Sequence, residues 1–98
     1  MRLTDIPTPA VLVESSRLER NLDRMQHAAD SRGLRLRPHA KTHKSPHVAA
    51  MQIQRGAAGI CCAKLGEAEV FADAGITDIR LPYPLHPINA ERVFALAD

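Results

Sequence analysis

Residues 57–63 read AAGICCA, and this short stretch decides the fold class. Every side chain in it is small or apolar, so neither face of the strand that it predicts is suited to water. Strands that are apolar on both faces are typical of parallel sheets, which helices cover outside and a filled barrel interior covers inside. The stretch therefore predicts a buried parallel strand.

The same alternation continues on both sides of this stretch. Expected strands cover residues 9–13, 34–37, 57–63 and 77–81, and expected helices begin near Ser16, Pro46, Leu65 and Pro87. Consecutive strand–helix units with short connections predict a parallel α/β sheet. No G-x-G-x-x-G sequence follows any strand, which weighs against a dinucleotide-binding fold. The residues alone leave a (β/α)₈ barrel and an open sheet as alternatives.

Helix ends are marked by local signals. Ser16 and Glu19 form an expected capping box, and Ser45 followed by Pro46 predicts a second helix start. Glycines 33, 56 and 75 are expected to stop helices. The last expected helix runs to Asp98 without such a glycine or a following strand. A (β/α)₈ barrel needs about 250 residues, so we expect a fragment of a longer protein.

Composition excludes several classes of protein. The 98 residues are 45% hydrophobic and 24% charged, with a net charge of +2 and only three aromatic residues, which gives no footprint for nucleic acid. No apolar run approaches the roughly 18 residues needed to cross a membrane. The only cysteines, Cys61 and Cys62, are adjacent and predict no disulfide framework, so we expect a cytoplasmic protein.

The densest chemistry lies in residues 37–47, which hold three histidines, two lysines and an arginine. This run follows the second expected strand, and parallel α/β folds build their sites at the carboxyl ends of strands. An extended chain would place Arg37, His39 and Lys41 on one face. The residues leave two interpretations of Lys41: a solvated surface lysine, or a Schiff-base lysine whose pKa is lowered by neighbouring positive charge.

Two alternatives concern the same run. His39, His43 and His47 have a spacing that could mimic metal ligands on a helix, but Pro46 breaks such a helix, so we expect no metal site here. Lys44 competes with Lys41 for the role of Schiff-base lysine.

A series of motifs resembles, in order, the D-threonine aldolase and D-serine dehydratase family. The matching segments are TPAVLV (8–13), LRPHAKTHK (36–44), GICCA (59–63), GEA (66–68) and AGITDI (74–79). The resemblance implies the alanine racemase-like architecture of fold type III enzymes, which use pyridoxal 5'-phosphate (PLP). That architecture has an N-terminal (β/α)₈ TIM-type barrel and a C-terminal β domain. In this pattern Lys41 is the catalytic lysine bonded to PLP, and His39 also binds the cofactor.

The resemblance also implies a division of the chain. Residues 1–15 would form an opening segment and strand that associates with the C-terminal β domain. Residues 16–98 would form the first helix and the first three βα units of the PLP-binding barrel. We expect the whole protein to work as a homodimer and the 98-residue piece alone to be inactive.

The implied function is a PLP-dependent lyase that acts on D-3-hydroxy amino acids, cleaving them in a retro-aldol reaction to glycine and an aldehyde. The first alternative is a D-serine dehydratase that gives a keto acid and ammonia. The second is a non-catalytic PLP-binding homeostasis protein. A racemase is the third alternative. Racemase relatives carry Ala/Ser-Asn-Ala-Tyr-Gly after the lysine, whereas residues 42–44 here are Thr-His-Lys, which weighs against it. A divalent metal (Mn, Mg or Zn) would assist the lyase, with ligands outside this chain.

Overall fold

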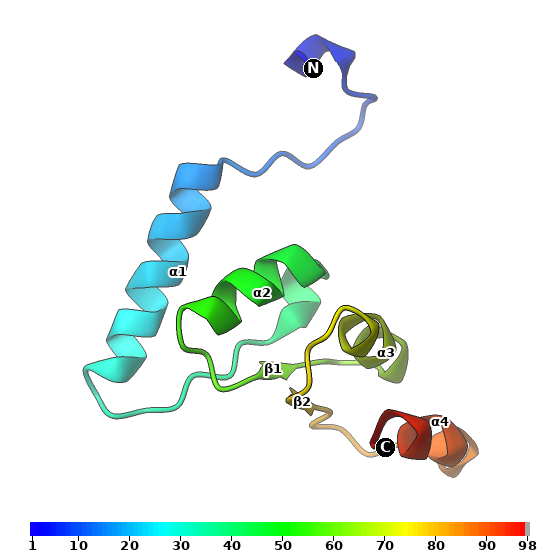
Figure 1. Cartoon of the computed structure of the whole chain (residues 1–98). Helices are drawn as coiled ribbons and strands as arrows, with labels where there is room; N and C mark the ends of the chain where they lie inside the picture. Colours follow the sequence, from blue (N-terminus) through cyan, green and yellow to red (C-terminus); the bar gives the residue numbers. More distant parts are fainter. Residues whose placement is uncertain (98) are drawn as a thin grey trace.

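The structure is a computed structural model, and it describes residues 1–97. In chain order the elements are the 3₁₀ helix η1 (Leu3–Asp5), α1 (Ser15–Asp30), η2 (Ala40–Thr42), α2 (Pro46–Gln54), β1 (Ile60–Cys61), α3 (Leu65–Asp73), β2 (Ile79–Arg80), η3 (Pro87–Asn89) and α4 (Ala90–Ala97). Figure 1 shows α1 to α4 arranged around a short sheet, with the N-terminal segment projecting beyond the first turn of α1. The predicted continuation of the last helix to Asp98 lies outside the described residues.

The sheet is parallel, as the apolar stretch at 57–63 predicts. Ile60 lies opposite Ile79, and Cys61 lies opposite Arg80. On the other side of β1, Cys61 forms a single parallel bridge with His39. Three chain segments therefore run side by side in the order 36–39, β1, β2.

The expected strand at residues 34–37 is only an extended segment. The backbone N–H groups of Ala58 and Cys61 donate to the carbonyls of Leu36 and Pro38, each at 2.8 Å. Pro38 has no N–H group, so it cannot donate to a ladder. The prediction of a regular strand at 34–37 is therefore wrong in detail, although the segment lies where a first barrel strand would lie.

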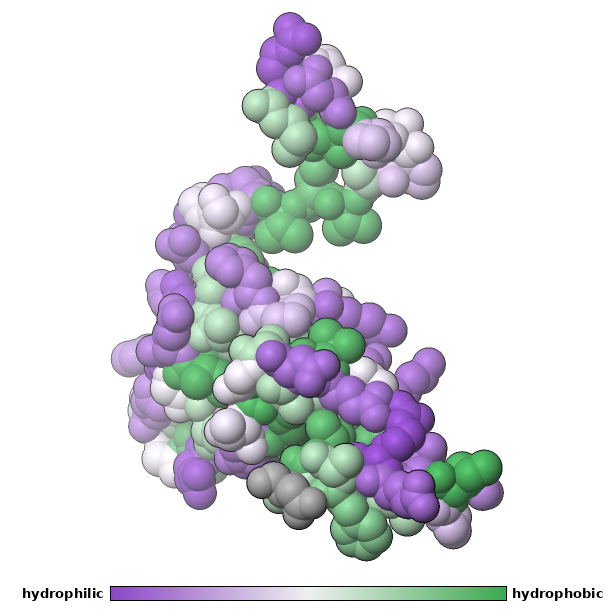
Figure 2. Space-filling view, turned by 45° about the vertical axis from the view of Figure 1, so that its right-hand side comes forward, coloured by the Kyte–Doolittle hydropathy of each residue, from purple (hydrophilic) through white to green (hydrophobic). Residues whose placement is uncertain are grey.

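The expected strand at residues 9–13 is also wrong for the described part of the chain. No ladder partner lies beside it among residues 1–97, and a strand needs a partner for its backbone N–H and C=O groups. Val11, Leu12 and Val13 are exposed. The space-filling view shows this segment standing away from the body of the molecule (Figure 2).

The start of α1 corrects the predicted capping box. The helix begins at Ser15, and the carboxylate of Glu14 accepts a hydrogen bond from the Ser16 N–H at 3.1 Å. A carboxylate suits the positive end of the helix dipole, so Glu14 takes the place predicted for Ser16. The predicted stop is confirmed: Gly33 adopts a φ of 64°, and the next N–H, that of Leu34, donates to the carbonyl of Ala29.

The start of α2 is confirmed as predicted. The Ser45 hydroxyl accepts a hydrogen bond from the Val48 N–H at 3.3 Å, and Pro46 is the first helical residue. Its fixed φ suits this position, and its missing N–H costs nothing there.

The core lies between the sheet and the helices α2 and α3. Its buried residues are Ala40, Ala49, Ile60, Cys62, Ala68 and Phe71. The alanines let the helices approach the strands closely, and Phe71 fills the space between them. Burial raises the pKa of the Cys62 thiol to about 11, so this side chain acts as a small apolar group. None of the described helices has the length and apolar character of a membrane span.

Candidate functional site

The turn that carries Lys41 leaves the sheet at His39. Ala40 is fully buried and begins η2, which places Lys41 on the exposed side of a tight turn. The backbone N–H of Lys41 donates to Nδ1 of His39 at 3.3 Å, and the N–H of Lys44 donates to the carbonyl of Ala40 at 2.8 Å. The backbone around Lys41 is therefore fixed at both sides by short-range hydrogen bonds.

Arg37 does not contribute its charge to this turn. Its guanidinium lies against Asp78, with Nη1–Oδ1 at 2.6 Å and Nη2–Oδ2 at 2.9 Å. Asp78 directly precedes β2, so the pair lies at the amino ends of the strands, and the hydrogen bonds that Arg37 donates to the Asp78 carboxylate raise the pKa of Arg37. The expectation that Arg37, His39 and Lys41 share one face is wrong, because the extended chain ends at His39 and η2 follows.

The two lysines of the run have different surroundings. Lys44 Nζ lies 3.4 Å from Oε1 of Glu67. Among residues 1–97, Lys41 Nζ makes no hydrogen bond or ion pair; only its backbone N–H is engaged. A Schiff-base lysine needs an amine that is free to bond to the cofactor, and the contact with Glu67 occupies the amine of Lys44. The geometry thus favours Lys41 over Lys44.

His39 presents an unusual buried donor. Because Nδ1 accepts from the Lys41 N–H, the neutral ring carries its proton on Nε2. Nε2 is buried and has no hydrogen-bond partner among the described residues. A buried donor without a partner costs free energy, so the arrangement suits a further polar group bound beside the Lys41 turn.

His43 has a structural environment instead. Its Nδ1 accepts from the Ser45 N–H at 3.0 Å, and its ring lies edge-on to Phe71 with centroids 6.4 Å apart. Burial lowers the pKa of His43, while Gln52 and the Ser45 backbone raise it in part. Its Nε2 and Oε1 of Gln52 are both buried without a hydrogen-bond partner within 1–97, so the nearby amide can serve this ring by a small movement.

The three histidines do not converge on one point. His47 is exposed on α2, while His39 and His43 are half-buried on the turn before it. The part of the chain that the structure describes holds no group of three or more His, Cys, Asp or Glu side chains placed to bind one metal ion.

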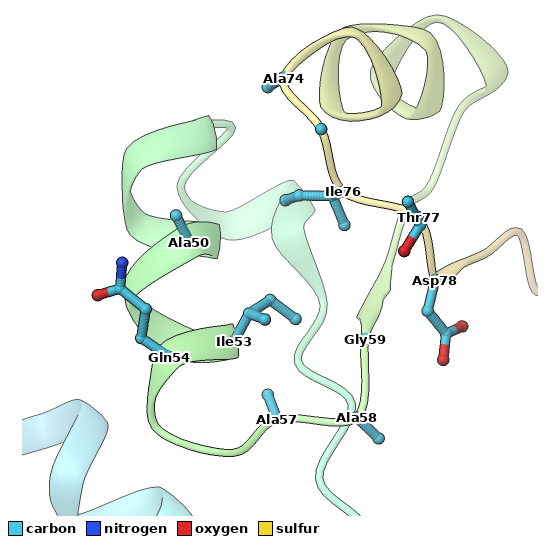
Figure 3. A pocket seen from close by; sticks show the side chains of 11 residues that line it. Ala50, Ile53, Gln54, Ala57, Ala58, Gly59, Ala74, Ile76, Thr77 and Asp78 are labelled. Atoms are coloured by element: carbon cyan, nitrogen blue, oxygen red, sulfur yellow. The ribbon is translucent and has the colours of Figure 1, made fainter.

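A cavity of about 360 Å³ lies at the opposite end of the strands. In Figure 3 it opens between α2 and the segment that enters β2, with Ile53 and Ile76 turned toward each other and Asp78 turned away from α2. Its lining is dominated by alanine, glycine and isoleucine, and its one ionisable side chain, Asp78, is already paired with Arg37. It therefore offers no chemistry of the kind that surrounds Lys41.

Two residues were missed as members of a site. Glu67 was noted only within a motif, and Asp78 only within a motif and a strand segment. A signal existed for Glu67, since an acidic residue in the first turn of a helix favours the helix dipole. Asp78 gave no local signal, because its partner lies 41 residues away.

The chain is similar in sequence to a known family and to several characterised proteins. The sequence profile of the alanine racemase, N-terminal domain, matches residues 13–97. The D-threo-3-hydroxyaspartate dehydratase of Delftia sp. (strain HT23) is 47% identical over 85 residues, which are 87% of this chain and 22% of that protein. The D-threonine aldolase of Arthrobacter sp. is 46% identical over 79 residues, 81% of this chain and 21% of that protein.

A solved structure shows the same fold. The crystal structure of D-threonine aldolase from Filomicrobium marinum has a TM-score of 0.91 and 44% identity, covering 97% of this chain and 26% of that one. The predicted fold class, the N-terminal part of an alanine racemase-like α/β barrel, is confirmed. The chain spans about a fifth to a quarter of the length of these relatives.

Proposed function

Because the chain belongs to the family of the alanine racemase N-terminal domain, we propose that the whole protein is a PLP-dependent lyase for D-3-hydroxy amino acids. Membership of this family implies the cofactor. Relatives named for aldolase or dehydratase activity on such amino acids support the substrate class. The single observation that carries the proposal is the Lys41 turn, which His39 holds through Nδ1 and whose lysine amine and buried His39 Nε2 both lack a partner within residues 1–97.

Lys41 and His39 are the residues proposed to hold the cofactor. Bound PLP supplies an electron sink for the bond that breaks at the substrate α-carbon. Lys41 supplies the amine that attaches the cofactor, and the fixed backbone of η2 presents that amine at the end of the first strand segment. His39 holds the turn through Nδ1 and offers Nε2–H to the bound group.

The reaction proposed first is the retro-aldol cleavage to glycine and an aldehyde. Dehydration to a keto acid and ammonia is the alternative, and relatives of nearly equal identity carry each activity. A divalent metal (Mn, Mg or Zn) forms part of the proposal, since it would stabilise the substrate hydroxyl as a Lewis acid. Its ligands are proposed to lie outside this chain.

The arrangement of the whole protein is part of the same proposal. Residues 1–15 are proposed to associate with a C-terminal β domain, which suits their exposed apolar side chains. Residues 16–98 are proposed to form the first helix and the first three βα units of the barrel. A homodimer in the cytoplasm is proposed as the working form, and the two free thiols of Cys61 and Cys62 suit a reducing compartment.

Activity assays of the whole protein test the reaction. D-Threonine and D-serine are supplied with and without a chelator, and the products are identified. Glycine supports the aldolase, pyruvate the dehydratase, and the L-amino acid a racemase. PLP binding without any turnover would support the non-catalytic alternative and contradict the lyase.

Substitution of Lys41 tests the attachment point. Lys41→Ala is expected to abolish turnover and the visible absorption band of lysine-bound PLP, because no other amine occupies that turn position. Lys44→Ala is the matched comparison, and at saturating PLP it should keep the band. A Lys41→Ala protein that retains both band and turnover would contradict the assignment.

Two substitutions separate the nitrogens of His39. In His39→Asn the side-chain oxygen can replace the Nδ1 acceptor but not the Nε2 donor, while His39→Gln does the reverse. Loss of one hydrogen bond to PLP is expected to weaken its affinity about tenfold in His39→Asn, and less in His39→Gln. The opposite order, measured by PLP titration, would show that only the Nδ1 contact matters.

A further inference from the structure

Lys44 has a strained backbone. Its φ of 50° makes it the only residue other than glycine in the left-handed region within 1–97. A side chain in that region costs about 1–2 kcal/mol, and such strain persists only where the surroundings fix it. Lys44 lies three residues after Lys41, so what fixes its backbone also shapes the turn that carries Lys41.

Two contacts hold Lys44, one through its backbone and one through its side chain. Its backbone N–H donates to the carbonyl of the fully buried Ala40 at 2.8 Å. Its Nζ reaches Oε1 of Glu67 at 3.4 Å. The first contact closes the turn around Lys41, and the second joins that turn to α3.

Glu67 is a well-anchored partner. Its side chain is 13% exposed, and Oε2 accepts a hydrogen bond from the backbone N–H of Ala63 at 2.9 Å. The Ala63 N–H, together with Lys44 and the backbone of Lys64, lowers the pKa of Glu67 against the effect of its burial. Ala63 follows β1, so one carboxylate contacts the loops that follow both the first strand segment and β1.

We infer that Lys44 and Glu67 form a latch, defined by the Nζ–Oε1 ion pair and the Oε2–Ala63 hydrogen bond, that positions Lys41 for cofactor attachment. The inference rests on the proposed function. Lys44 and Glu67 are positioning residues, which act through the turn rather than on the cofactor. The latch gives the Lys44 amine a carboxylate partner, whereas the Lys41 amine has none within 1–97.

A plain surface ion pair would have a smaller role. Lys44 is 64% exposed in its side chain, and exposed pairs contribute about 0–1 kcal/mol to stability. The latch differs because it holds a strained backbone beside an attachment point, where a displacement of about 1 Å can change a rate 100-fold. Its effect should therefore appear in cofactor binding more than in stability.

The test uses the whole protein, four single variants, and the double variant that combines Glu67→Gln with Lys44→Met. Glu67→Gln keeps an oxygen for the Ala63 N–H but removes the charge, and Lys44→Met removes the charge while keeping much of the side-chain length. Lys44→Arg keeps the charge and is the conservative rescue. Glu69→Gln is the matched control, because Glu69 lies on the same helix and pairs instead with Arg92 at 2.6 Å.

The measurements are the PLP dissociation constant, the fraction of PLP trapped on Lys41 by borohydride, and urea unfolding. Glu67→Gln and Lys44→Met are expected to weaken PLP binding about threefold to tenfold, and the double variant no more than either single one, because both break one interaction. Lys44→Arg should restore most of the affinity, and Glu69→Gln should match the unchanged protein.

Each outcome decides the inference. Unchanged PLP affinity in both single variants, or a double variant whose loss is the product of the two, would overturn the latch while trapping on Lys41 upholds the proposed function. Equal weakening by Glu69→Gln would also overturn it, because any charge lost from α3 would then have the same effect. Failure of the unchanged protein to trap PLP on Lys41 would overturn the proposed function and the latch together.

Discussion

The two ends of the parallel strands each carry an ion pair, and the pairs differ in kind. At the amino ends, Arg37 and Asp78 meet through two contacts of 2.6 and 2.9 Å. At the carboxyl ends, Lys44 and Glu67 meet through one contact of 3.4 Å, with a strained backbone at the lysine. At the amino end the ion pair joins two segments of the sheet, whereas at the carboxyl end the Lys41 amine has no partner within the described residues 1–97. In (β/α)₈ barrels the first kind of end serves stability and the second serves chemistry.

Gly59 allows Arg37 to reach Asp78 at the amino ends of the strands. It lies directly before β1, between the segment of Arg37 and Asp78, the residue that precedes β2. An added Cβ would lie 2.4 Å from Arg37 Nη1 and 2.5 Å from the carbonyl oxygen of Asp78. The guanidinium can cross β1 only because this position has no side chain.

Gly59→Ala should therefore break the amino end, and we expect the largest effect there. The clash with the Asp78 backbone has no flexible group to absorb it, so the free energy of unfolding should fall by about 1–3 kcal/mol. Urea unfolding of the whole protein measures this. Gly66→Ala is the control: its added Cβ meets only the Glu69 carboxylate at 4.0 Å, inside a helix that favours alanine. Equal stability of the two variants would contradict the close approach.

A matched pair of methionine substitutions compares the two ion pairs. Arg37→Met removes a half-buried group with contacts to Asp78 and should cost about 1.5 kcal/mol of stability, the low end for a hydrogen bond to a charged group, because Asp78 is exposed. Lys44→Met should cost less than about 1 kcal/mol. PLP affinity should show the reverse order. A larger stability loss in Lys44→Met, measured by urea unfolding, would contradict the division of roles.

The smallest effects are expected in the dependence of stability on acid pH. This dependence should separate the causes of the two lowered carboxyl pKa values. Arg37 lowers the pKa of Asp78 below its ordinary 3.8, and chiefly the Ala63 N–H lowers that of Glu67 below its ordinary 4.5. A carboxyl with a lowered folded pKa adds stability above its unfolded pKa, and this stability is lost as the pH falls through the folded pKa. The losses should begin near pH 4.5 for Glu67 and near pH 3.8 for Asp78.

The variants distinguish the two carboxyls in this acid range. Arg37→Met should flatten the loss of stability that begins below pH 3.8, because it removes the main cause acting on Asp78. Lys44→Met should leave most of the Glu67 contribution, because the Ala63 N–H remains. Urea unfolding at a series of pH values measures how steeply stability falls with acid in each variant. A flatter fall in Lys44→Met but not in Arg37→Met would contradict these assignments.

Local signals in the sequence predicted what local physics determines. The cap at Ser45, the stop at Gly33 and the buried stretch at 57–63 are confirmed, since each depends on a few neighbouring residues. The cap of α1 was misplaced, because Glu14 and Ser16 are both suitable acceptors and only the helix start decides between them.

The site was predictable only in part, for a related reason. The run at 37–47 could be recognised as chemically dense, but the sequence did not show which charges in it were already paired. Arg37 was expected beside Lys41 and is paired with Asp78 instead, 41 residues away. Partners across strands depend on the register of the sheet, which no spacing within one segment reveals.

Peptide mapping of the lysine that carries PLP tests the central claim most directly. The whole protein is reduced with borohydride and digested, and the modified peptide is sequenced by mass spectrometry. We predict that the cofactor is on Lys41 and that Lys44, in the same peptide region, is unmodified. Cofactor on Lys44, or on neither lysine, would contradict it.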